Sequence, residues 1–129
     1  MGVAQPTATS TGREAELSSQ AQAAELLRWC SHRLETLIAD VERLQHSPPD
    51  DIDRDRLLRW RRRAIAKLRN ATRVMQEKLE LAERAIEAVP VAQHGLVMAA
   101  MELRVAITKA IDVARDDRLH LGEERSPVS

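Results

Sequence analysis

The chain has 129 residues, of which 43% are hydrophobic, and its formal net charge is zero. This length has room for one domain with one core, and the zero net charge excludes a bulk attraction to nucleic acid or anionic lipid. The only aromatic residues are Trp29 and Trp60, and there are four glycines. A β-sandwich or barrel needs more aromatic, β-branched and turn residues than this. The composition therefore predicts an all-α protein with a core of Leu, Ile, Val, Ala and Met.

Cys30 is the single cysteine, which excludes an intrachain disulfide and a cysteine-based metal site. The first residues lack the basic start and apolar run of a secretory signal. No stretch approaches the roughly 18 apolar residues of a membrane span. We therefore expect a cytoplasmic protein with no membrane contact. Of the 20 basic residues 17 are Arg, which is typical of a GC-rich bacterial genome.

The first part of the chain divides into an arm and a long helix. Residues 1–15 begin with a Thr-, Ser- and Ala-rich segment without periodicity, which predicts a disordered arm. From about residue 17 to residue 46 apolar side chains recur every three or four positions, as in one face of a helix. This row forms almost three heptads of a coiled-coil seam and consists of Leu27, Cys30, Leu34, Leu37, Val41 and Leu44.

Two prolines, Pro48 and Pro49, end the first helix, and a Ser or Asp of the same segment can cap the next one. The pattern predicts a second helix over residues 52–88, stopped by Pro90, and a third over residues 92–117, followed by a flexible tail over residues 122–129. Short links between long helices favour antiparallel neighbours. We therefore predict an antiparallel up-down-up three-helix bundle, with the bundle domain over residues 16–121.

The second helix carries an unusual density of positive charge. Between Arg54 and Arg73 there are nine Lys or Arg residues and one acid, Asp55. At about 100° per residue, one row on this helix is formed by Arg59, Arg62, Arg69 and Arg73, and a second flank by Arg63 and Lys67. Such rows can bind the phosphates of a nucleic acid or an acidic protein. The alternative is neutralisation inside the bundle by acids of the other helices, namely Glu35, Asp40, Glu42, Asp112, Asp116 and Asp117.

Arg61 interrupts the apolar row of the second helix between Leu58 and Ile65. A buried guanidinium needs a partner. The sequence favours an arginine near the end of the bundle that extends past Trp60 or Leu57 into solvent.

The third helix has more apolar surface than one bundle core needs. Beyond its core row it carries Val97, Met98, Met101 and Val105, and the facing part of the second helix carries Val74 and Leu81. We predict that these six residues form an oligomer interface, most simply that of a homodimer. The alternative is that Leu26, Trp29 or the arm folds over this surface.

No catalytic or metal site is expected, because the four histidines lack partners at metal-ligand spacing, and no cofactor is expected. The segment Arg115-Asp116-Asp117-Arg118-Leu119-His120 resembles the Arg-x4-His signature of helical ribonucleases of the HEPN type. This resemblance covers six residues and implies RNA cleavage by Arg115 and His120 at a dimer cleft. A charged helix terminus is the alternative interpretation.

Three functional hypotheses follow from the sequence. The first is a non-enzymatic helical interaction or assembly protein that self-associates and docks a protein partner. The second is a DNA- or RNA-binding accessory protein that uses the arginine row. The third is a HEPN-like ribonuclease.

Overall fold

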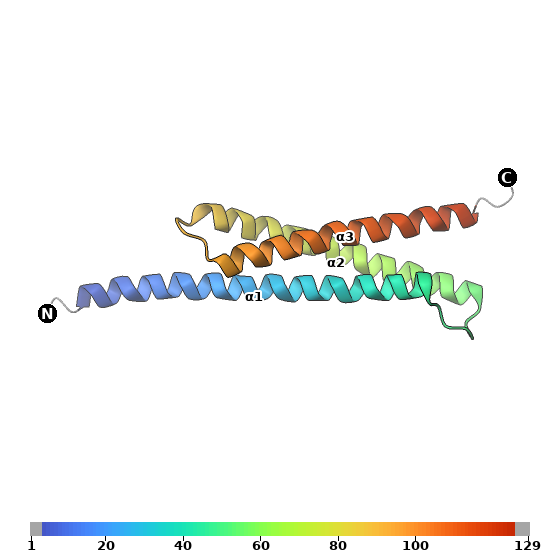
Figure 1. Ribbon diagram of the computed structural model, residues 1–129, viewed down its shortest axis with the longest axis horizontal. Coiled ribbons are helices and arrows are strands. Elements are labelled where there is room, and N and C mark those ends of the chain that lie inside the picture. The colour runs from blue at the N-terminus through green and yellow to red at the C-terminus, as the bar shows by residue number, and fades with distance from the viewer. Residues whose placement is uncertain (1–3, 126–129) are drawn as a thin grey trace.

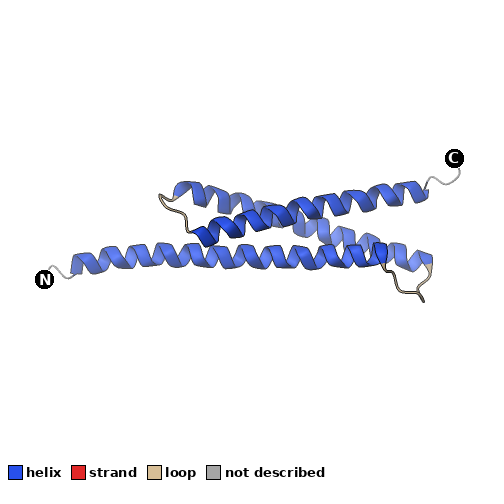
Figure 2. Cartoon of the chain, in the orientation of Figure 1, coloured by secondary structure: helices blue, strands red, loops and turns tan. Residues whose placement is uncertain are grey.

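A computed structural model describes the backbone of residues 4–125 and the side chains of residues 12–115. It consists of three helices, α1 (Ala4–His46), α2 (Arg54–Ala88) and α3 (His94–Arg125). All three pack against one another, with α2 antiparallel to α1 and α3 (Figure 1). Helix and two short connections account for the whole described chain (Figure 2). The predicted all-α, up-down-up three-helix bundle is therefore confirmed.

The first connection follows from its prolines and an aspartate. α1 ends at His46, directly before Pro48 and Pro49. Asp53 then has extended backbone angles and its carboxylate accepts a 2.8 Å hydrogen bond from the backbone N–H of Arg56. This satisfies one of the N–H groups that the first turn of a helix leaves without a partner. The expected Asp cap is therefore present, and α2 begins two residues after the predicted position.

The core lies between the three predicted apolar rows. Leu34, Leu68 and Leu103, one from each helix, are fully buried at the centre of the bundle. The row predicted for α1 is buried except for the half-buried Leu44, and the row on α3 is buried throughout. Ala99, Ala100, Ala106, Ala110 and Ala114 give α3 a surface of small side chains, also buried. Small side chains let helix axes approach closely, which suits a core almost without aromatic residues.

The helix boundaries at the two chain ends differ from the predicted ones. α1 begins at Ala4 rather than near residue 17, and α3 continues to Arg125 rather than ending near residue 117. Pro6 does not prevent the early start, because it lies in the first turn, where a missing N–H breaks no helical bond. Within the described chain, the first part of α1 projects beyond the α2–α3 connection (Figure 1). The rest of the predicted arm and tail, residues 1–3 and 126–129, lies outside the described residues.

Arg61 corrects another expectation. Its side chain is only 6% exposed, so the guanidinium does not extend into solvent as the sequence suggested. Arg61 lies two helical turns before the buried Leu68, on the same face of α2, and its side chain therefore points into the bundle. Burying such a group is favourable only with polar partners, which makes this end of the core less apolar than its centre.

Candidate interaction surfaces

One apolar patch lies where α1 and α2 meet, and we call it the seam patch. It consists of Leu26, Trp29, Val74 and Leu81, each about half exposed or more. Trp29 lies three helical turns before Asp40, and Val74 lies two turns after Lys67. Asp40 and Lys67 line the same cavity between α1 and α2, so these apolar side chains also border the seam between these helices.

The α1 and α2 residues of the seam patch also lie at the same level along the bundle axis. The charge of Lys78 on α2 acts on the thiol of Cys30 on α1. Leu26 and Trp29 are within about one turn of Cys30, and Leu81 is one turn after Lys78. The patch therefore combines two side chains from each helix at a similar level along the α1–α2 seam, where Trp29 is 60% and Leu81 is 63% exposed.

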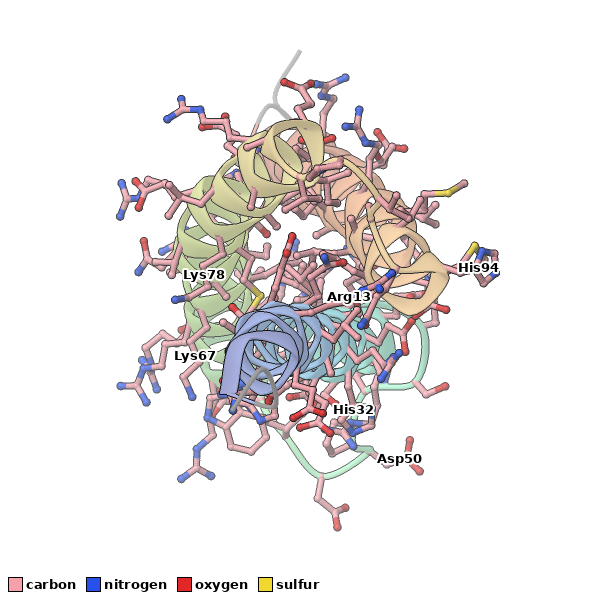
Figure 3. All side chains as sticks on the ribbon, turned by 90° about the vertical axis from the view of Figure 1, so that its left-hand side faces the viewer. Arg13, His32, Asp50, Lys67, Lys78 and His94 are labelled. Atoms are coloured by element: carbon pink, nitrogen blue, oxygen red, sulfur yellow. The ribbon has the colours of Figure 1, made fainter. Side chains whose placement is uncertain are left out.

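A second apolar group lies on the outer side of α3, and we call it the α3 patch. It consists of Met98, Met101 and Val105, of which Val105 is 68% exposed. These residues follow His94 by four, seven and eleven positions, so they share its helix face. His94 points away from the bundle on the side of α3 (Figure 3). The α3 patch therefore faces outward, directly away from the core.

The two apolar patches lie on different sides of the molecule. Figure 3 places Lys67 and Lys78 on the α2 side of the bundle and His94 on the opposite, α3 side. Val74 and Leu81 share the helix face of these lysines, whereas the α3 patch shares that of His94. The six residues predicted as one oligomer interface are thus divided, and Val97 is half-buried between them. Leu26 and Trp29 do not cover this surface; they enlarge it on the α1 side.

The basic residues of α2 are likewise divided over two sides of the helix. All six predicted residues are exposed. Arg69 and Arg73 line a groove of about 290 Å³ beside α3, together with Ile111 and Arg115. Arg63 and Lys67 instead line the cavity beside α1. Arg59 and Arg62 continue the row of Arg69 and Arg73 toward the start of α2.

Among residues 12–115, the acids of α1 and α3 form no ion pairs with these six basic residues of α2. Asp40 pairs with Arg43 at 2.9 Å, and Glu42 pairs with Lys109 of α3 at 3.8 Å. Arg104 of α3 pairs with Glu83, away from the basic stretch. Among residues 12–115, no ion pair involves the six predicted basic side chains, and Glu35 and Asp112 pair with none of them. Asp116 and Asp117 lie outside the described side chains.

The residues of the ribonuclease-like segment are placed only in part. Arg115 is exposed and lines the groove beside Arg69 and Arg73. The side chain of His120 lies outside the described ones. Within the described residues, no group of three or more His, Cys, Asp or Glu is arranged to hold a metal ion. No described helix is both long enough and apolar enough to cross a bilayer.

Comparison with known protein families, curated proteins and solved structures gives no match for this chain. The function is therefore inferred from the surfaces themselves.

Proposed function

We propose that the protein is a non-enzymatic helical assembly protein that self-associates through the seam patch and docks a protein partner on the α3 patch. The exposure of Trp29 beside Leu26, Val74 and Leu81 carries this proposal. A contiguous apolar surface that includes a tryptophan is typical of interaction sites rather than of an inert surface. Its border holds both signs of charge, with Arg33, Lys78 and Glu77, so two copies can meet without net repulsion.

The free energy available from burying the seam patch predicts a weak dimer. Full burial of a Val, Leu or Trp side chain contributes about 1.5–3 kcal/mol. Four half-exposed side chains therefore leave on the order of 4 kcal/mol unused in each copy, and about twice that in a two-fold pair. Association itself costs at least about 4 kcal/mol. The remaining free energy of about 4 kcal/mol corresponds to a dissociation constant of about 1 mM.

Sedimentation equilibrium from about 10 µM to about 1 mM tests the self-association. The average mass should rise with concentration in the parent and stay monomeric in Leu81→Asp. Ala66→Asp is the matched control, because it adds the same charge to an exposed position of the same helix outside the patch. A parent that stays monomeric over the whole range, or a Leu81→Asp variant that associates like the parent, would contradict the proposal.

The α3 patch is free to bind another protein in such a dimer, since it lies on the opposite side. Met98 and Met101 have flexible, polarizable side chains that adapt to different partner surfaces. Met101→Asp should therefore leave the parent's mass distribution unchanged. A loss of dimer in Met101→Asp would instead assign self-association to α3. A cytoplasmic setting is consistent with the single free cysteine.

Nucleic-acid binding is the second candidate, favoured by the row Arg59, Arg62, Arg69 and Arg73, which forms no ion pair with side chains of residues 12–115. Four arginines over about 21 Å of helix can each contact a phosphate. Binding would then weaken with salt by about 3.6 log units per log unit of salt. Titration should show this slope for duplex DNA and a slope of about 2.8 for single-stranded RNA. The combined substitution Arg62→Glu, Arg69→Glu, Arg73→Glu should abolish binding. The matched control carries three charge reversals on α1, namely Arg13→Glu, Arg28→Glu and Arg33→Glu. Absence of binding at low salt would exclude this candidate.

The ribonuclease hypothesis is tested separately. RNA cleavage that is lost in His120→Ala would support it. An inactive parent, or a variant as active as the parent, would exclude it.

A further inference from the structure

A cavity lies between the last turns of α1 and the first turns of α2. It has a volume of about 500 Å³, is open to solvent and ends at the connection between the two helices. Small-molecule sites typically occupy about 300–1,000 Å³ and combine apolar walls with a few polar groups. The size of this cavity therefore suits a ligand of one or two rings.

The walls of the cavity are apolar and include an aromatic ring. Its apolar lining consists of Leu37 and Leu44 of α1, Trp60 and Ala64 of α2, and Pro49 of the connection. Trp60 is 40% exposed, and the guanidinium of Arg56 lies 5.9 Å from the centre of its ring. A cation at this distance stabilises the ring in its orientation. An indole held at the wall of an open cavity is suited to stacking with a second aromatic ring.

The rim of the cavity is positively charged. Arg63 and Lys67 line it from α2 and are exposed, without an ion pair among residues 12–115. Asp40 is the one acid in the lining, and it binds Arg43 of its own helix at 2.9 Å. This pair is neutral as a unit, so the rim keeps the two positive charges of Arg63 and Lys67. An anionic group at the rim would be attracted to both.

We propose that this cavity is a binding site for a small aromatic carboxylate. The rings would stack on Trp60 within the apolar lining, and the carboxylate would bind Arg63 and Lys67 at the rim. The site is built from one chain, so it does not depend on self-association. It also assigns Arg63 and Lys67 a ligand different from that of the arginine row on the other side of α2.

A matched pair of probes tests the proposal, namely 1-naphthoate and 1-naphthalenemethanol. They share the ring system, but only the first carries a charge. The two tryptophans give two indole N–H signals in a ¹⁵N–¹H NMR spectrum, and a Trp29→Phe variant assigns them. We expect 1-naphthoate to shift the Trp60 signal with one-site saturation and to leave Trp29 unchanged. The alcohol should bind about tenfold more weakly.

Charge variants locate the carboxylate. Arg63→Glu combined with Lys67→Glu should weaken naphthoate binding about tenfold or more and remove its advantage over the alcohol. The control, Arg59→Glu combined with Arg62→Glu, makes the same change on the same helix outside the cavity and should keep the advantage. Unsaturable shifts of both indole signals, or an advantage that survives the Arg63 and Lys67 reversals, would overturn the proposal.

The same titration in Leu81→Asp separates this site from the proposed dimer. Unchanged affinity is expected there, whether or not the parent associates. Loss of binding in Leu81→Asp would overturn the single-chain site.

Discussion

The side chain of Gln20 in α1 accepts a 2.7 Å hydrogen bond from the backbone N–H of Gln93, at the start of α3. Its amide nitrogen donates to the carbonyl of Val91 at 3.4 Å. Gln93 in turn donates from its side chain to the carbonyl of Leu17 at 3.1 Å. Gln20 is only 6% exposed. These bonds fasten the α2–α3 connection to α1, and they also give partners to backbone groups of this half-exposed connection.

Replacing Gln20 should therefore destabilise the bundle. Gln20→Ala leaves the N–H of Gln93 without its acceptor, and we expect the free energy of unfolding to fall by about 1–3 kcal/mol. Urea denaturation followed by circular dichroism measures this change. Gln22→Ala, two residues away and exposed, should change it by less than about 0.5 kcal/mol. Equal effects of the two substitutions would show that the Gln20 bonds do not hold the connection.

The cap of α2 gives a second prediction. Asp53→Ala removes the acceptor for the N–H of Arg56, and we expect a loss of about 1 kcal/mol in the free energy of unfolding. Asp53→Asn keeps an acceptor oxygen and should cost only a few tenths of a kcal/mol. Asp51→Ala is the control, because Asp51 is an exposed acid of the same connection that does not cap the helix. Thermal unfolding of the three variants should reproduce this order.

Cys30 predicts a pH dependence. Its side chain is fully buried, and burial raises the pKa of the thiol above its ordinary value of 9.0, while the charge of Lys78 partly opposes this shift. The folded state thus binds the thiol proton more tightly than the unfolded state does. This contribution to stability is fully present below about pH 9 and is lost as the pH rises through the folded-state pKa. The stability of Cys30→Ala relative to the parent should therefore improve above about pH 9.

The same burial predicts a slow thiol reaction. An aromatic disulfide reagent at neutral pH should modify Cys30 only as fast as the bundle opens, because the reaction needs an accessible thiolate. Added urea should accelerate the modification in parallel with unfolding. Immediate modification of the native protein would contradict the buried position of Cys30.

The projecting part of α1 gives a fifth prediction. Residues 12–16 are all exposed, and polar contacts with the rest of the bundle begin at Leu17 and Gln20. A helical segment without tertiary packing is marginally stable in water. We expect backbone amides of residues 12–16 to exchange with solvent at least about 100-fold faster than that of Leu34. Equal protection would indicate that a second copy or a partner covers this segment.

Much of the bundle could be predicted from the sequence because its signals are local. The three- and four-residue spacing of Leu27, Leu34 and Val41 specifies a helix face whatever lies opposite. Pro48 and Asp53 end one helix and begin the next through bonds within a few residues. The chain ends were less predictable, because helix without tertiary packing has no apolar periodicity to mark its limits.

The sequence also identified which side chains exceed the needs of one core, among them Met101, Val105 and Leu81. It did not reveal that Leu81 and Met101 lie on opposite sides of the bundle, since this depends on how each helix is rotated about its axis. The same holds for Arg61, whose burial depends on neighbours far away in the chain.

The sequence by itself thus determined the helices, their order and the apolar rows between them, because hydrophobic periodicity, proline and capping act over a few residues. Only the tertiary structure decided which exposed residues share a surface. It placed Trp29 and Leu81 along the same α1–α2 seam, joined Gln20 to Gln93 and formed the Trp60 cavity between two helices. The physical reason is that these contacts join distant residues, and each is set by packing of all three helices together.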